Sequence, residues 1–122
     1  MTTRIALVAL LAALVLPSAV AQADNPKLVA VVGTNDAFVI SLRDANGNAI
    51  TQLAPGTYDI SVSDRSEAHN FHLKGPGVNR STSVGFIGER IWTVTLKPGK
   101  YTYWCDPHSS MMHGSFRVVA SS

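Results

Sequence analysis

Alternation between apolar and polar residues is the feature that most restricts how this chain can fold. Beyond residue 23, apolar side chains recur at every second position, most clearly in 58–62, 92–96 and 101–105. A period of two residues is the repeat of a β-strand that buries one face. No later stretch keeps a helical period for three turns. The sequence therefore predicts an all-β chain.

Short strands separated by turns indicate the architecture. Four further strands are expected, at 28–32, 38–42, 69–73 and 116–118. Gly, Pro and Asn mark the joints, at Asn46-Gly47, Pro55-Gly56, 75–77 and Pro98-Gly99. Strands of this length at regular spacing favour a β-sandwich or a small barrel.

The first 23 residues are expected to be a cleaved secretory signal peptide. Arg4 supplies a short positive start, and 5–16 is a run of 12 apolar residues. Ala-x-Ala sites then end at Ala21 and at Ala23, the preferred cleavage point. A bilayer span takes about 20 apolar residues, so no membrane insertion is expected. The prediction is one mature domain, 24–122, exported to the periplasm or secreted.

Composition narrows the class of protein. Hydrophobic residues make up 46% and charged residues 15% of the chain, which is the balance of a domain with a buried core. The formal net charge is only +2, with no run of Lys or Arg, so nucleic-acid binding is not expected. The mature chain is close to neutral, and its charge gives no clue to a partner.

The single cysteine, Cys105, raises a chemical question. Small exported domains usually gain stability from disulfides or from a metal, and one cysteine cannot form an intramolecular disulfide. Cys105 is therefore either buried and inert or a metal ligand.

Cys105 is also the first residue of a Cys-x2-His-x3-Met motif, which continues with His108 and Met112. The motif lies where a predicted strand ends and a loop begins. Thiolate and thioether are soft ligands, and imidazole suits copper. Two His and one Cys with a weak axial Met describe a blue-copper site. We expect His69 to supply the second imidazole. Met111 is the alternative axial residue to Met112.

Side-chain parity supports these choices. His69 has the parity of the apolar residues at 71 and 73, and Met112 has that of 116 and 118, so both are expected to turn inward. His72 and His113 are expected to face solvent, and a weak second metal site between them is an alternative.

These residues resemble the cupredoxins, the plastocyanin/azurin group of small blue copper proteins. The resemblance covers most of the mature chain as a strand pattern and is most specific over 67–118. It is carried by His69-Asn70, Pro98-Gly99-x-Tyr101-x-Tyr103-x-Cys105, Pro107-His108 and Met112-x-Gly114. The short Cys-x2-His spacing is closer to plastocyanin, pseudoazurin and amicyanin than to azurin.

The resemblance implies a Greek-key β-sandwich with one type 1 copper at one end, bound by His69, Cys105, His108 and Met112. It also implies that Asn70 ties the two ligand loops together. Asp106 stands where Ser or Thr is usual in the family, and it places a carboxylate beside the thiolate.

The expected surface for electron transfer is His108 with Pro107, bordered by Pro76, and Trp104 offers a second route. The expected function is one-electron transfer between larger redox proteins by a monomer. A copper carrier or resistance protein is the alternative, favoured slightly by Met111 and the two extra histidines. A metal-free immunoglobulin-like module is a third candidate.

An enzyme is not expected. Multicopper oxidases need His-x-His pairs, and the chain has none. A CuA centre needs two cysteines, and a Cys–His hydrolase would need an orienting partner that the sequence does not supply.

Overall fold

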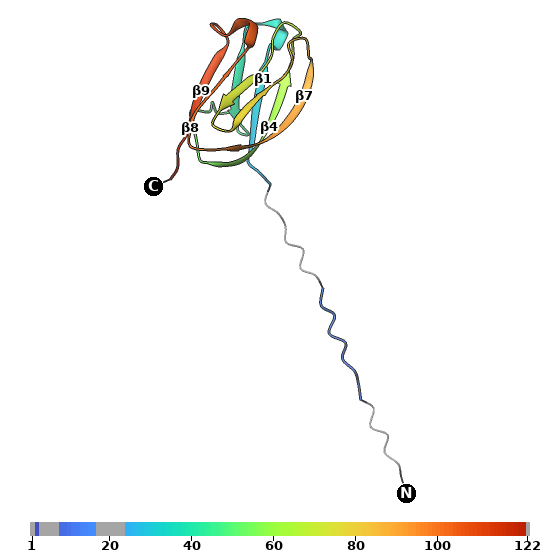
Figure 1. Ribbon diagram of the computed structural model, residues 1–122. Helices are drawn as coiled ribbons and strands as arrows, with labels where there is room; N and C mark the ends of the chain where they lie inside the picture. Colours follow the sequence, from blue (N-terminus) through green and yellow to red (C-terminus); the bar gives the residue numbers. More distant parts are fainter. Residues whose placement is uncertain (1, 3–7, 17–23, 122) are drawn as a thin grey trace.

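Nine β-strands in two facing sheets form the folded domain in the computed structural model, which describes residues 2, 8–16 and 24–121 (Figure 1). The first sheet has the order β2 (Ile40–Asp44), β1 (Lys27–Val32), β4 (Gly56–Asp64) and β7 (Gly88–Leu96). The second has the order β3 (Gln52–Leu53), β9 (His113–Val118), β8 (Gly99–Trp104), β5 (His72–Gly75) and β6 (Val78–Ser81). The predicted all-β, Greek-key sandwich is confirmed.

Two short 3-10 turns lie close together at one end of the sandwich (Figure 1). The turn η1 (Thr34–Asp36) follows β1, and η2 (Asp106–His108) follows β8. β1 and β4 pair in parallel, as do β3 and β9, and the other strand pairs are antiparallel. The turns that follow β1 and β8, which belong to different sheets, therefore lie at the same end of the molecule.

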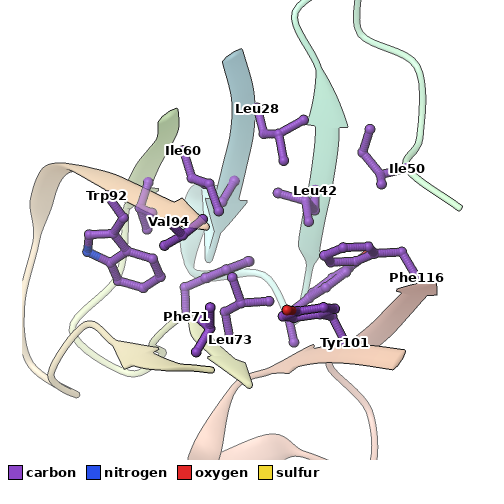
Figure 2. Packing of buried hydrophobic residues seen from close by; sticks show 14 of the residues in the cluster. Leu28, Leu42, Ile50, Ile60, Phe71, Leu73, Trp92, Val94, Tyr101 and Phe116 are labelled. Carbon is purple, nitrogen blue, oxygen red and sulfur yellow. The ribbon is translucent and has the colours of Figure 1, made fainter. Parts of the chain in front are cut away.

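The core lies between the sheets and takes side chains from both (Figure 2). In the first sheet Ile60 pairs with Trp92 in register, and both are buried. In the second, the rings of Tyr101 and Phe116 stack with centroids 5.3 Å apart. Burying one such side chain stabilises the fold by about 1.5–3 kcal/mol. The same cluster includes Cys105, so the core reaches the expected metal ligands.

The predicted strand at 38–42 is shorter than expected. β2 begins only at Ile40, and Phe38 lies outside it with 52% of its surface exposed. The chain enters this segment through Asn35 and Asp36, whose φ angles of 55° and 60° are left-handed. A strand cannot form until the chain has left this turn.

The predicted strand at 69–73 also starts late, because β5 begins at His72. His69 lies in the preceding turn, and its N–H donates to the carbonyl of Ser66. It is buried nevertheless, as its parity predicts. The short edge strand β6 was not predicted, since Val78 is its one buried residue and a single apolar position gives no period of two.

Part of the predicted signal peptide lies within the described residues. Residues 8–16 have no regular secondary structure and exposed side chains. Residues 3–7 and the cleavage sites in 17–23 lie outside the described part, so cleavage stays a prediction. Among the described residues, no helix has the length and apolar character needed to cross a membrane.

Close packing around Gly114 yields a test of the second sheet. Gly114 pairs with Tyr103, and a Cβ at this position would overlap the ring and hydroxyl of that tyrosine. We expect Gly114→Ala to lower the free energy of unfolding by about 1–3 kcal/mol, the range for overpacking. Chemical denaturation checks this, with the exposed neighbour Ser115→Ala as a control that changes it by less than about 0.5 kcal/mol. Equal stability of the two variants would contradict the packing.

Candidate metal centre

A closed loop carries three of the four residues that the sequence singles out as ligands. β8 ends at Trp104, and η2 follows with Pro107 near its start. The N–H of His108 donates to the carbonyl of Cys105 (3.1 Å), and that of Met112 donates to the carbonyl of His108 (2.9 Å). The N–H of Cys105 donates back to the carbonyl of Met112 (3.0 Å). These bonds join the two ends of the Cys-x2-His-x3-Met motif.

The fourth residue, His69, comes from the turn between β4 and β5, and its side chain is buried. The start of η1 lies against this turn at Gly33. A Cβ on Gly33 would lie 2.6 Å from Cβ of Ser66 and 3.1 Å from Cδ2 of His69, and its φ of +72° is left-handed. Glycine is therefore needed here for η1 to cover His69.

Three donor atoms meet at this end of the core. Nδ1 of His69 and Nδ1 of His108 are 3.0 Å apart, and Sγ of Cys105 is 3.7 Å from each. The centre of such a triangle lies about 2 Å from each corner. Imidazole nitrogen and thiolate sulfur bind a metal such as zinc at about 2.0–2.3 Å, so the three donors fit one metal ion of that size.

A backbone carbonyl fixes the orientation of His69. Its Nε2 lies 3.2 Å from the carbonyl oxygen of Asp36. A carbonyl only accepts hydrogen bonds, so Nε2 carries the hydrogen and Nδ1 presents its lone pair to the centre. The left-handed backbone at Asn35 and Asp36 aims this carbonyl, and Asn and Asp tolerate that conformation better than most residues. Sequence reasoning missed this contact.

Asn70 joins the His69 turn to the Cys105 loop. Its Oδ1 accepts the N–H of Asp106 (2.7 Å), and its Nδ2 donates to Oδ2 of Asp106 (2.8 Å) and to the carbonyl of Thr82 (3.0 Å). The backbone N–H of Asn70 points at Sγ of Cys105, 3.4 Å away. One buried residue thus connects both ligand segments and the residue that follows β6.

The carboxyl groups of Asp106 and Asp64, both near the site, have opposite pKa shifts. Burial raises the pKa of Asp106, but hydrogen bonds from Asn70, His72 and Trp104 outweigh it and hold the pKa below its ordinary value. The Asp106 carboxylate is therefore stabilised one residue from Cys105.

Asp64 lies deeper, at the end of β4. Burial raises its pKa, although hydrogen bonds from Thr82 and the Ser66 N–H oppose the shift. The Thr82 hydroxyl donates to Oδ2 of Asp64 (2.7 Å) and accepts the N–H of Phe71 (2.9 Å). This chain of bonds attaches the turn that holds His69 and Asn70 to β4.

The two methionines of the loop differ in how far their side chains are buried. Met112 is 1% exposed and belongs to the core, whereas Met111 is 66% exposed. The carbonyl of Met112 also accepts the N–H of Cys105. Met112 is therefore buried in the loop that also carries Cys105 and His108, as its parity predicts, and the side chain of Met111 faces solvent.

Phe38 was missed as a site residue because it alternates with Ile40 in the sequence and was assigned to a strand. Its ring meets the imidazoles of His69 and His108 edge-on, with centroids 5.0 Å and 4.6 Å away. His108 is half-buried and Pro107 is exposed. The exposed ring of Phe38 therefore covers both imidazoles on the solvent side of the centre.

The expectation that Pro76 borders this surface is wrong. Pro76 packs at the start of β8, where a Cβ on Gly99 would lie 2.7 Å from its Cγ. Cys105 follows the opposite end of the same strand. The Gly-Pro-Gly loop therefore lies at the far end of the sandwich from the metal centre.

The extra histidines do not join the centre. His113 is exposed, as predicted. His72 is less exposed than predicted, because its ring stacks on Trp104 and its nitrogens contact Asp106 and Asn79. Trp104 lies between His72 and His113 in the sheet register. Within the described residues, the group of three metal-binding side chains is His69, Cys105 and His108.

The sandwich, the converging His69, Cys105 and His108, and the buried Met112 in the same loop define a type 1 copper protein, with soft sulfur and imidazole donors for one copper ion. Residues 25–119 match the model of the copper-binding proteins of the plastocyanin/azurin family. The chain belongs to this family. No curated protein sequence matches the chain.

Solved structures of rusticyanin have the same fold. Reduced rusticyanin is 18% identical, with 81% of this chain and 82% of that chain covered and a TM-score of 0.59. Rusticyanin from Thiobacillus ferrooxidans is 20% identical, with 76% of each chain covered and a TM-score of 0.53.

The contacts of Asn70 predict a large effect of its removal. We expect Asn70→Ala to lower the unfolding free energy of the metal-free protein by about 2 kcal/mol or more, because it leaves buried hydrogen-bonding groups unsatisfied. Urea denaturation checks this. Asn46→Ala, in an exposed turn, is the control and is expected to change stability by less than about 0.5 kcal/mol. A stability loss no larger than that of the control would contradict the role of Asn70.

Proposed function

We propose that this protein carries single electrons between larger redox proteins, with copper bound by His69, Cys105, His108 and Met112. When bound, copper supplies the chemistry by alternating between Cu(I) and Cu(II). The fold holds the donors and sets their spacing.

The convergence of the three donor atoms, 3.0–3.7 Å apart, is the observation that carries this proposal. Each donor is fixed by the backbone: Cys105 and His108 by the bonds of the closed loop, and His69 by the Asp36 carbonyl. A donor set fixed in this way cannot move far when the charge at its centre changes. Small rearrangement is what rapid electron transfer requires.

Burial of the donors favours electron transfer over copper delivery, the alternative function. His69, Cys105 and Met112 are at most 1% exposed, and His108 is half-buried. A carrier has to release its ion to another protein, and that requires ligands within reach of the recipient. An electron needs only one ligand ring at the surface, and His108 meets that condition.

An enzymatic role is not part of the proposal. Catalytic metal sites keep one coordination position open for water or substrate. Two imidazoles, a thiolate and a thioether from the protein leave no such position in a site of this type.

The surface around His108 suits a docking partner. Phe38 is 52% exposed beside its ring, Met111 is 66% exposed, and Pro107 is exposed next to it in the chain. We assign electron exit to the His108 ring and the docking contact to this apolar surface, with the protein acting as a monomer. Trp104 is a second route on the neighbouring sheet face. Residues 1–23 would direct export to the periplasm, where the mature chain 24–122 would act.

The thiolate gives the proposal its first test. Residues 24–122, loaded with one equivalent of Cu(II), are expected to show an intense thiolate-to-copper absorption band and a narrow copper hyperfine splitting. Cys105→Ser is expected to lose both, because the band needs the sulfur. A colourless wild-type protein, or one with the broad signal of ordinary tetragonal copper, would exclude the electron-transfer site.

The two methionines give a second test. We expect Met112→Leu to raise the reduction potential, because loss of the axial thioether removes a donor that stabilises the more positive oxidised ion. Voltammetry measures the shift, and Met111→Leu is the matched control and should leave the potential unchanged. A larger shift for Met111→Leu than for Met112→Leu would reverse the assignment.

A further inference from the structure

His72 lies outside the donor set but contacts the residue next to Cys105. It begins β5, and its side chain is on the outer face of the second sheet with 19% exposure. Its ring stacks on Trp104, with centroids 4.2 Å apart and 29° between the planes. Stacking fixes the plane of the imidazole and therefore the direction of both ring nitrogens.

Both nitrogens of His72 face oxygen atoms. Nδ1 lies 2.9 Å from Oδ1 of Asp106, and Nε2 lies 2.6 Å from Oδ1 of Asn79. A carboxylate only accepts hydrogen bonds, so Nδ1 carries the hydrogen of the first contact. The Trp104 indole N–H donates to the same Asp106 oxygen at 2.7 Å. His72 and Trp104 therefore both hold Oδ1, the outer oxygen of Asp106.

The inner oxygen of Asp106 accepts from Asn70, and the Asp106 N–H donates back to Asn70. Asn70 in turn directs its backbone N–H at Sγ of Cys105. An unbroken path of hydrogen bonds therefore joins His72 to the thiolate.

We propose that His72 is a positioning residue that sets the reduction potential of the copper site through Asp106. The inference rests on the proposed function. An anionic carboxylate one residue from the thiolate stabilises the more positive oxidised ion and lowers the potential. The hydrogen bond from Nδ1 of His72 draws on that charge and keeps the carboxylate in the geometry that Asn70 requires. Without the hydrogen bond from His72, the full negative charge of the Asp106 carboxylate acts on the metal.

The test compares two histidines on one sheet face. His72→Phe keeps a ring to stack on Trp104 but removes both hydrogen bonds. His113→Phe is the matched control, because His113 flanks Trp104 on its other side. Asp106→Asn, alone and combined with His72→Phe, completes a double-mutant cycle. The variants are made in the full chain and purified after processing.

The first readout is the reduction potential. We expect His72→Phe to shift the equilibrium about tenfold towards the oxidised form, a fall of about 59 mV for one electron. His113→Phe should change it less than twofold. In the Asp106→Asn background, His72→Phe should also have less than a twofold effect. A potential equal to wild type in His72→Phe, or an undiminished shift without the carboxylate, would overturn the proposal.

The second readout uses the metal-free protein. The Asp106 N–H, which donates to Asn70, is expected to exchange with solvent at least tenfold faster in His72→Phe and at the wild-type rate in His113→Phe. Unchanged exchange would overturn the positioning role even in a protein that took up no copper. Failure of wild type to form the copper site would instead contradict the proposed function.

Discussion

The hydrogen bonds of Asn70 hold the two halves of the metal centre together, and the rest of the site depends on them. His69 and Cys105 belong to segments that neither share a strand nor follow one another in the chain. Asn70 connects them through both atoms of its amide and through its backbone N–H. The amide can do this only because it is buried, where water does not compete for its bonds.

Both sheets contribute to the rigidity of this arrangement. The first sheet supplies β4, whose end is attached through Asp64 and Thr82 to the turn that carries His69. The second supplies β8, which continues directly into the loop that starts at Cys105. The two sheets share one continuous core (Figure 2), and Cys105 and Met112 belong to it, so core packing also holds these two residues in place. A fold whose stability resides in its core thereby also fixes the geometry of its functional centre.

Periodicity and ligand chemistry reveal much of this molecule in the sequence. Alternation predicts β4, β8 and the second half of β7, from Trp92 to Leu96, because these stretches bury one face. Parity turns His69 and Met112 inward. The sequence fails where one segment depends on another that is distant in the chain. Phe38 is assigned to a strand because its parity fits, yet a left-handed turn places it over His108. The Asp36 carbonyl is a backbone group, so no residue type in the sequence indicates its contact with His69.

The central claim is that the fold holds one donor geometry for both oxidation states. X-ray absorption at the copper edge tests this directly, by measuring copper–ligand distances in the oxidised and then in the reduced protein. We predict the same nitrogen and sulfur ligands in both, with almost unchanged distances, because the backbone and Asn70 fix every donor. Loss of a histidine ligand on reduction, or a change in ligand number, would contradict the account.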